Sequence, residues 1–242
     1  MRYGRATALA SADIVIPYGK VTGLVGPNGA GKSSLLLALY GSVEASGRVY
    51  LDQTDVSRMP AVARARLGIA FVPQGRQLFP LLTVRDNLRV MAELLKLDPR
   101  SIEEALDRFP ILRVRERSLA GVLSGGEQQM LVVSRAMMGS PRVLLLDEVA
   151  TGLAPLIVQS LAETFQRLAE GGLAVLYAAP EIGAVRDRID RGYVIVRGVL
   201  VACEESGGEP LDTAYRSAMG LALVINNRLN TDNLGKEKTS PR

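Results

Sequence analysis

The sequence has no histidine and no tryptophan, and it contains a single cysteine, Cys203. The absence of imidazole excludes catalysis of the Ser-His-Asp and Cys-His types and any histidine-ligated metal site. One cysteine can form neither a zinc-binding thiolate cluster nor an intrachain disulfide. This usage is typical of proteins in a reducing compartment, so the cytosol is the default location.

Long apolar runs are also absent. The first twenty residues lack the sustained apolar core of a signal peptide, and the longest apolar stretches, such as 218–225, fall well short of the roughly 18 residues that span a bilayer. We therefore expect any membrane role to come through a partner. The net charge is only +4, and half of it lies in residues 225–242, which argues against a nucleic-acid surface.

The composition is that of a globular protein, with 48% hydrophobic and 22% charged residues among 242. Short apolar runs alternate with helix-like stretches, which is the rhythm of parallel strands joined by crossover helices in an α/β fold. The runs that predict strands are 21–26, 68–72, 143–147, 173–179 and 192–196. Residues 82–119 are rich in helix formers and predict a helical subdomain, inserted at about 82–140. We place one domain at 1–224 and a polar, flexible tail at 225–242.

A glycine-rich segment follows the apolar run 21–25 and precedes a helical one. It reads GPNGAGKS and matches the phosphate-loop pattern G-x-x-x-x-G-K-[ST] in the strand–loop–helix context that the pattern demands. Glycines let backbone N–H groups turn toward phosphate oxygens, Lys32 supplies a cation for the β- and γ-phosphates, and the Ser33 hydroxyl is the expected Mg²⁺ ligand. The alternative is a glycine-rich turn with a chance lysine. The predicted nucleotide-binding residues here are Gly26, Pro27, Asn28, Gly29, Ala30, Gly31, Lys32, Ser33 and Ser34.

Two acids end the predicted strand 143–147. In a parallel sheet, ligands gather at the carboxyl ends of the strands, so Asp147 is expected to face the Mg²⁺ site. Glu148 follows one residue later, and strand alternation directs it elsewhere, toward a water that attacks the γ-phosphate. Glu148 is therefore the candidate general base. An acidic turn after a buried strand is the alternative interpretation.

The segment Leu123–Gln129, LSGGEQQ, stands shortly before this strand. Ser124, Gly125 and Gly126 open a predicted helix, so a serine hydroxyl, free N–H groups and the helix dipole form a second anion site. Ser124 and Glu127 also form the pattern of an ordinary capping box. The segment resembles the signature motif of ABC ATPases, and the three motifs occur in the order typical of that family.

The resemblance covers most of residues 3–205. It implies a phosphate-loop NTPase core with a mostly parallel sheet, a small antiparallel β subdomain and an inserted helical subdomain, binding ATP and Mg²⁺. In this family the signature of one subunit closes over the nucleotide held by another. Gln74 takes the place of the glutamine that contacts Mg²⁺, the attacking water and the transmembrane partner. Tyr3 takes the place of the aromatic residue that stacks on adenine. Residues 151–155 take the place of the D-loop.

Longer strings resemble one branch, the ATP-binding subunits of branched-chain amino-acid importers, with urea and amide importers as alternatives. These strings are VPQGRQLFPLLTVRDNL, LSGGEQQML, DEVATGLAP and DRGYVIVRG. The branch implies a second ABC ATPase subunit, identical or more typically related, transmembrane permease subunits, and a solute-binding protein acting indirectly. The expected location is the cytoplasmic face of the cell membrane, reached through the permease.

Three positions depart from the family pattern. Tyr3 is almost the first residue, so the strand that normally precedes it is expected to be missing, and a misplaced start is the simpler explanation. Pro180 falls at or beside the position of the switch histidine, which removes a contact to the γ-phosphate and predicts slow hydrolysis; a helix from Pro180 through Arg188 is its structural interpretation. Val149 replaces a common proline, with a small effect expected.

Two other functions compete with a transporter motor. One is a degenerate or regulatory ABC domain that binds ATP with little hydrolysis. The other is an unrelated phosphate-loop kinase or GTPase. The guanine-binding pattern N-K-x-D does not occur, which argues against a GTPase. A kinase function does not explain the segment 123–129.

Overall fold

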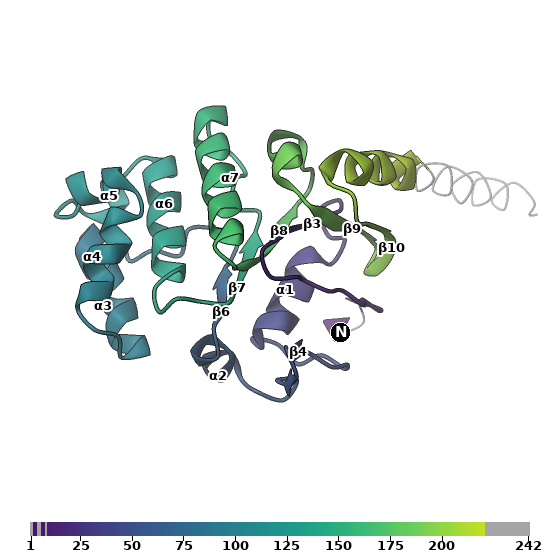
Figure 1. The fold of residues 1–242 in the computed structure, drawn as a ribbon, viewed down its shortest axis with the longest axis horizontal. Coiled ribbons are helices and arrows are strands. Elements are labelled where there is room, and N and C mark those ends of the chain that lie inside the picture. The colour runs from purple at the N-terminus through teal and green to yellow at the C-terminus, as the bar shows by residue number, and fades with distance from the viewer. Residues whose placement is uncertain (1, 4–5, 8, 221–242) are drawn as a thin grey trace, which may run out of the picture.

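The computed structural model describes residues 2–3, 6–7 and 9–220. Within them, a six-stranded sheet has the order β10-β9-β3-β8-β7-β6, and its neighbouring strands are parallel except for the β9–β10 pair (Figure 1). All five predicted strand segments are strands of this sheet, with ends that differ by at most one residue. The strands are β3 (Val21–Val25), β6 (Ile69–Val72), β7 (Val143–Asp147), β8 (Ala174–Ala179), β9 (Arg191–Val196) and β10 (Val199–Glu204).

Helices cover both faces of the sheet, because alternate side chains of the buried strands point to opposite sides. On β7, Val143 and Leu145 pack into the apolar cluster beneath α1 (Lys32–Tyr40), whereas Leu144 and Leu146 pack into the cluster on the other face. The helix α2 (Ala61–Arg66) lies against β6, and α7 (Pro155–Glu170) lies against β3 and β8. Residues 208–220 are helical and insert Leu211 over two glycines of β3 and β9.

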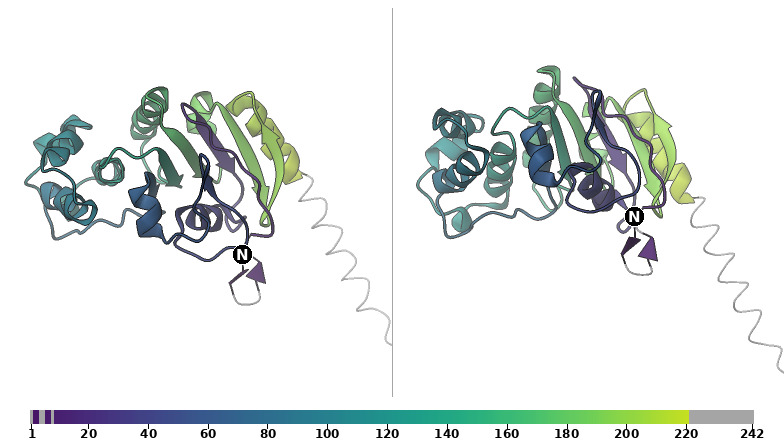
Figure 2. Two further views of the ribbon diagram at one scale, coloured as in Figure 1. Left: turned by 60° about the horizontal axis from the view of Figure 1, so that its bottom comes forward. Right: turned by 90° about the horizontal axis from the view of Figure 1, so that it is seen from below.

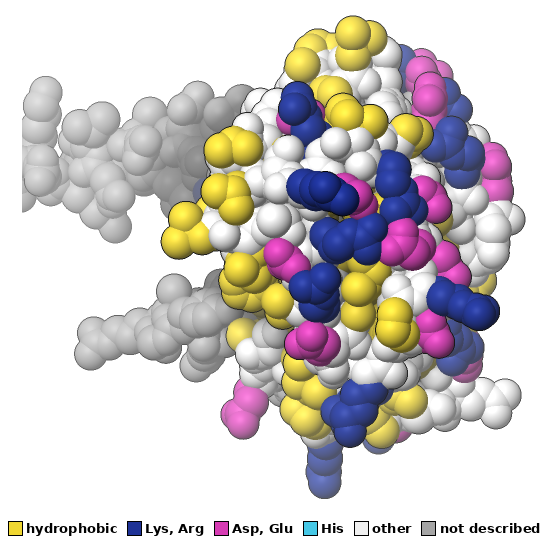
Figure 3. Space-filling view, turned by 90° about the vertical axis from the view of Figure 1, so that its left-hand side faces the viewer, with side chains coloured by type: hydrophobic (Ala, Val, Ile, Leu, Met, Phe, Trp, Pro, Cys, Tyr) yellow, Lys and Arg dark blue, Asp and Glu magenta, His cyan; other side chains and the backbone are white. Residues whose placement is uncertain are grey.

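The predicted helical insertion lies between β6 and β7 and forms one end of the molecule (Figures 1 and 2). Its elements are α3 (Val84–Leu95), α4 (Arg100–Asp107), α5 (Pro110–Val114), the 3₁₀ turn η1 (Ala120–Val122) and α6 (Gly125–Ala136). On its outer end, acidic and basic side chains alternate with apolar ones (Figure 3). None of the helices in the described part of the chain is long and apolar enough to cross a membrane.

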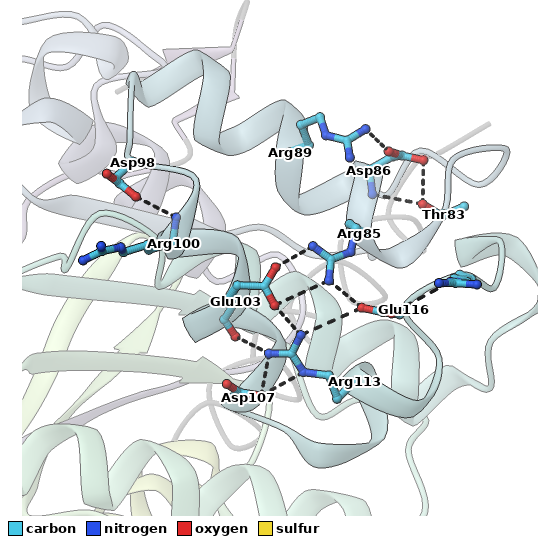
Figure 4. A network of polar contacts seen from close by, with 11 residues as sticks. Thr83, Arg85, Asp86, Arg89, Asp98, Arg100, Glu103, Asp107, Arg113 and Glu116 are labelled. Carbon is cyan, nitrogen blue, oxygen red and sulfur yellow. Dashed lines mark hydrogen bonds and ion pairs between the residues drawn. The ribbon is translucent and has the colours of Figure 1, made fainter.

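A charge network joins three of these helices (Figure 4). The Arg85 guanidinium bridges Glu103 and Glu116, each at 2.6 Å, and Arg113 contacts Glu103 and Asp107. Hydrogen bonds from Arg85 and Arg113 lower the pKa of Glu103 to about 2. The network lies on the surface, so solvent screens it and its contribution to stability is small.

The small antiparallel part consists of two separate hairpins. One pairs β1 (Arg2–Tyr3) with β2 (Ala6–Thr7) and stands away from the central sheet in both views of Figure 2. The other pairs β4 (Tyr50–Leu51) with β5 (Thr54–Asp55). Tyr3 is thus in a two-residue strand, and its side chain lies outside the described residues, as does the predicted tail 225–242.

Proline at 180 does not start a regular helix. The 3₁₀ turn η2 (Gly183–Arg188) begins three residues later, so the prediction of a helix from Pro180 through Arg188 is wrong in its start and its type. Ile182, which is 1% exposed, turns into the core with φ −109° and ψ 5°, outside the helical region. Burial of this side chain outweighs the preference of proline for a first helical turn.

The loop that follows β6 is held to the helical insertion by one fully buried side chain. The Oδ1 atom of Asn87 on α3 accepts from the Phe79 N–H at 2.9 Å, and its Nδ2 donates to the carbonyls of Phe79, Leu82 and Thr83 at 3.0, 3.3 and 2.9 Å. Four hydrogen bonds from one buried side chain therefore hold the loop to α3.

We expect Asn87→Ala to lower the free energy of unfolding by about 1–3 kcal/mol, because it leaves the Phe79 N–H without its partner and removes three further hydrogen bonds to the loop. Chemical denaturation of both proteins measures the difference. Glu93→Ala, at an exposed position of the same helix, is the control and is expected to change it little. Equal effects of the two substitutions contradict this role of Asn87.

Candidate functional site

The phosphate-loop segment forms the turn between β3 and α1, as predicted. Gly29 and Gly31 adopt left-handed conformations with φ 78° and 108°, which a side chain would strain. A Cβ atom at Gly26 would lie 2.1 Å from the Ile195 carbonyl oxygen. The Ala30 N–H donates to the Pro27 carbonyl at 3.0 Å, closing the loop. Asn28 and Gly29 are exposed at its tip, and Ser33 and Ser34 are half-buried in the first turn of α1. The glycines therefore stand where the backbone requires them.

Lys32 is the buried cation of this loop, with 3% of its side chain exposed. Its Nζ atom donates to the carbonyl oxygens of Gly26 and Pro27 at 2.8 and 3.2 Å, and it lies 3.2 Å from Oε1 of Glu148. Because a buried charge is costly without a partner, this contact fixes the lysine and the glutamate together. The geometry brings the loop and the carboxylate strand to one point.

Glu148 reaches this point through a turn rather than through strand alternation. The strand β7 ends at Asp147, and Glu148 has φ 51°, while its N–H donates to the Ala178 carbonyl at 2.9 Å. A left-handed conformation is uncommon outside glycine and is concentrated at functional sites. The second carboxylate oxygen, Oε2, accepts from Nε2 of Gln74 at 3.0 Å. Glu148 thus lies between Lys32 and Gln74.

Asp147 faces the start of α1 from the end of β7. It is 2% exposed, and its Oδ1 atom is buried without a hydrogen-bond partner. Burial raises the pKa of Asp147, and so does the charge of Glu148, whereas the Ser33 hydroxyl and Lys32 lower this pKa. A buried, unpaired carboxylate oxygen close to a hydroxyl is the donor set that Mg²⁺ prefers. The residues present therefore fit the predicted ion.

Tyr177 and a small cavity lie beside Glu148. Tyr177 on β8 is 4% exposed, and burial, with the negative charge of Glu148, raises its pKa to about 12. A cavity of about 350 Å³ opens beside Glu148, between the loop after β6, the start of α6 and the turn after β7. Gln74, Arg76, Gln128 and Thr151 line it. Of these, Gln74 is a predicted site residue, Gln128 and Thr151 lie in the predicted segments 123–129 and 151–155, and Arg76 is not a predicted site residue.

Ser124 begins α6 on the helical insertion and is exposed. Its Oγ accepts from the Glu127 N–H at 3.3 Å, and its own N–H donates to the Glu127 carboxylate at 2.7 Å, so the capping box forms. Gly126 is buried, and a Cβ there would lie 3.1 Å from Ile157 of α7. The polar contacts described for Ser124 lie within this turn, away from the phosphate loop of its own chain. The serine tip faces outward, as a site for a second molecule requires.

Pro180 and Val149, the two other positions that depart from the family pattern, lie close to the ends of β8 and β7. Pro180 follows β8 directly, is half-buried, and has no side-chain donor for a phosphate. Val149 is buried at 4% exposure.

A cavity of about 1380 Å³ between residues 9–18 and 41–52 has none of the predicted catalytic groups in its lining.

Sequence reasoning missed three side chains that hold the loop after β6: Asn87, Arg76 and Arg135. Their contacts join positions up to 58 residues apart, and no short pattern encodes them. The only local signal is Asn87 itself, an amide inside an otherwise amphipathic helix.

A phosphate loop with a buried lysine, together with a strand that ends in Asp147 and is followed at once by Glu148, defines an NTPase of the phosphate-loop class. The family described as ABC transporter matches residues 9–151, which include all three predicted motifs. The chain belongs to this family, and it is an ATP-hydrolysing ABC ATPase subunit that binds nucleotide. The predicted family, fold class and enzymatic activity are thereby confirmed.

Three relatives of similar identity belong to two kinds of transport system. The chain is 38% identical over 202 residues to the high-affinity branched-chain amino acid transport ATP-binding protein BraG of Pseudomonas aeruginosa, covering 82% of this chain and 87% of the relative. It is 34% identical to the probable branched-chain amino acid transport ATP-binding protein LivF of Archaeoglobus fulgidus, covering 92% and 95%. It is also 33% identical to the lipopolysaccharide export system ATP-binding protein LptB of Escherichia coli, covering 83% and 85%.

Among solved structures, the chain is similar to the ADP conformation of MJ1267, an ATP-binding cassette of an ABC transporter. The TM-score is 0.82 at 25% identity, covering 93% of this chain and 95% of that one. A dimeric bacterial ABC transporter cassette, MJ0796, shares the fold with a TM-score of 0.74 at 22% identity, covering 83% and 91%.

Burial of Asp147 destabilises the folded protein when its carboxylate is charged. Because its pKa is raised in the folded protein, its favourable contribution is complete below the unfolded pKa, near 3.8, and is lost as the pH rises through the folded value. We expect Asp147→Asn to raise the Tm of the protein at pH 7 when no ligand is added, because the amide carries no charge to bury.

Calorimetry from pH 7 down to pH 4 measures the effect, and the gain is expected to shrink as the pH falls, because the raised pKa of Asp147 favours its protonated form in the folded protein. Asp187→Asn, at a side chain 88% exposed, is the matched control and is expected to leave the Tm unchanged. A gain that grows toward acid pH, or that the control shares, contradicts the assignment.

Proposed function

We propose that the chain is the ATP-binding and hydrolysing subunit of an ABC importer for branched-chain or related amino acids. In this role it couples ATP-driven closure of a dimer to transport. One observation carries the catalytic part: Lys32 and Gln74 both contact Glu148, next to a buried and unpaired Asp147 oxygen. The importer and its substrate rest on the names of BraG and LivF and on the strings quoted above. LptB, an export ATPase of similar identity, is the competing relative.

The nucleotide enters by exchange of partners at Lys32. The loop of residues 26–34 lays its N–H groups around the phosphates, and the Lys32 ammonium turns from Glu148 to the β- and γ-phosphates. Ser33, Gln74 and Asp147 are the residues that would hold Mg²⁺, which when bound neutralises charge on the phosphates. Exchange of one ionic partner for another avoids leaving Lys32 buried and unpaired.

Glu148 is the general base of hydrolysis. Released from Lys32, its carboxylate accepts a proton from the attacking water, whose oxygen bonds to the γ-phosphorus while the bond to the ADP oxygen breaks. Gln74, at 3.0 Å from the same carboxylate, orients that water. Tyr3 is proposed to stack on adenine.

The exposed tip at Ser124, Gly125 and Gly126 is proposed to cap the triphosphate held by a second ABC ATPase subunit, identical or related. An outward-facing serine and the N-terminus of a 12-residue helix suit an anion that comes from another molecule. The subunit on its own is then expected to hydrolyse ATP poorly.

The permease subunits are proposed to contact the apolar side chains beside the Gln74 loop. Phe79, Leu81, Leu119 and Val122 are 47%, 83%, 42% and 74% exposed, and backbone hydrogen bonds join their two segments. Exposed apolar patches of this kind mark protein interfaces. This contact would place the chain at the cytoplasmic face of the membrane, with the solute-binding protein a partner only indirectly.

Pro180 favours a second candidate function, a regulatory ABC domain that closes a dimer with little hydrolysis. Loss of a charge-assisted hydrogen bond to the γ-phosphate costs about 1.5–3 kcal/mol. Because Lys32, Ser33, Asp147 and Glu148 are all present, slow hydrolysis is the expected outcome, rather than none.

Two substitutions separate binding from chemistry. We expect Lys32→Ala to raise the Kd for ATP about tenfold or more, because it removes a charge-assisted contact. Glu148→Gln is expected to bind ATP but to lower kcat by about 10²–10⁴, because the amide cannot accept the proton. Fluorescent-nucleotide titration and phosphate release, with the permease complex present, measure both. If the native chain binds ATP but turns over no faster than Glu148→Gln, the regulatory function replaces the motor.

Ser124→Arg tests the second-subunit contact. The substitution is expected to leave ATP affinity of the monomer within about twofold while abolishing the ATP-dependent dimer, because a bulky cation blocks the tip without touching its own phosphate loop. Sedimentation with and without ATP, with the related subunit added where one exists, measures the dimer. Loss of ATP binding to the monomer shows that Ser124 has been misplaced.

A further inference from the structure

Tyr177 is a buried titratable residue that the proposed hydrolysis does not use. It lies on β8, and 4% of it is exposed. Its ring packs against the ring of Phe165 on α7, with the two centroids 6.3 Å apart and the planes inclined by 43°. No residue in the described part of the chain forms a hydrogen bond with its hydroxyl. A hydroxyl with so little access to water is costly unless it finds a partner.

The turn that carries Glu148 lies over the same face of the sheet as Tyr177. Val149, the residue after Glu148, is buried in the apolar cluster that also holds Tyr177. The strands β7 and β8 are parallel neighbours, with Leu146 opposite Tyr177, and both of these side chains pack into that cluster. The Glu148 N–H then donates to the carbonyl of Ala178, the residue after Tyr177, at 2.9 Å. The backbone therefore holds Tyr177 and the proposed general base side by side.

The charge of Glu148 acts on this phenol. Burial, and then the negative charge of Glu148, raise the pKa of Tyr177 to about 12. The hydroxyl therefore keeps its proton at neutral pH and is available as a hydrogen-bond donor.

Glu148 loses one of its two partners in the proposed exchange. Its Oε1 atom lies 3.2 Å from Nζ of Lys32, and its Oε2 atom accepts from Gln74 at 3.0 Å. When the lysine turns to the phosphates, Oε1 needs another partner, because only 9% of the Glu148 side chain is exposed. Burial without a partner favours the protonated form of a carboxylate, which cannot act as a base. Pro180, directly after β8, has no side-chain donor to supply.

We propose that Tyr177 is a positioning residue, whose hydroxyl replaces Lys32 as the donor to Oε1 of Glu148 once nucleotide is bound. This inference rests on the proposed function. The phenol keeps the carboxylate ionised, because a hydrogen bond to the charged form favours that form. Together with Gln74, it holds the carboxylate toward the attacking water. Tyr177 acts through Glu148 and does not touch the phosphates itself.

Tyr177→Phe keeps the ring and removes only the hydroxyl. With the permease complex present, we expect kcat to fall about tenfold, the size of a lost hydrogen bond to a charged group, while KM for ATP stays within about twofold. The acid limb of the kcat profile is expected to move to higher pH, because Glu148 loses a donor that favours its charged form. Among the described residues, the charged groups around this carboxylate are Lys32 on α1, Asp147 on β7 and Arg76 after β6, and all three are unchanged in this variant.

Tyr40→Phe is the matched control. The Tyr40 ring also packs against a phenylalanine, Phe71, with centroids 5.3 Å apart. Burial raises the pKa of Tyr40 as well, but no neighbouring charge contributes to that shift. The control therefore removes a hydroxyl of the same kind away from the carboxylate, and it is expected to leave kcat and its pH profile unchanged.

A second measurement does not depend on turnover. With fluorotyrosine incorporated at position 177 alone, the fluorine NMR signal reports the surroundings of this phenol. A non-hydrolysable ATP analogue with Mg²⁺ is expected to shift the signal, because the hydroxyl gains an acceptor. The same label at position 40 is expected to show no shift. A signal at position 177 that does not respond to bound nucleotide overturns the inference, whether or not Tyr177→Phe folds.

The outcomes separate this inference from the proposed function. A native chain that hydrolyses ATP no faster than Glu148→Gln overturns the proposed motor and the inference together. A native chain that hydrolyses ATP faster, with Tyr177→Phe at the native kcat and pH profile, overturns the inference alone. A lower kcat that comes with a lower Tm, or that Tyr40→Phe shares, assigns Tyr177 to packing and also overturns it.

Discussion

The ion pair between Lys32 and Glu148 is the interaction on which the rest of the site depends. Its atoms are 3.2 Å apart, with 3% and 9% of the two side chains exposed, so each charge is stabilised mainly by the other and by nearby polar groups. Removal of one partner leaves the other buried and uncompensated, which is strongly destabilising. A triphosphate is an alternative partner for the lysine. The structure therefore already holds both residues in the place where the proposed exchange occurs.

The second constraint is the attachment of the Gln74 loop to the helical insertion. Asn87 and Arg135 fix its backbone from two helices, and Arg76 presses against the first turn of α6. The core touches the same loop through Glu148. The loop is therefore fixed at several points to the helical insertion and by the side chain of Gln74 to the core.

Much of the fold could be predicted because it is encoded locally. The strand 143–147 is a short apolar run that ends in an acid, and Gly29 and Gly31 of the phosphate loop stand where φ is positive. The turn at Glu148 could not be predicted, because its left-handed conformation depends on the bond from its N–H to Ala178, thirty residues away. The same holds for Arg76, whose partner is 52 residues distant. Proline prefers the first turn of a helix, but the burial of Ile182, two residues after Pro180, outweighs that preference and no helix starts there.

The central claim is that ATP takes Lys32 from Glu148. A crystal structure of the full chain with Mg²⁺ and a non-hydrolysable ATP analogue measures this most directly, through the distances from Lys32 Nζ to the phosphate oxygens and to Glu148 Oε1. We predict that Nζ lies within hydrogen-bond distance of the β- and γ-phosphates and has left Glu148, whose carboxylate faces a water. Nucleotide bound in the loop, with Lys32 still paired to Glu148, would contradict the account.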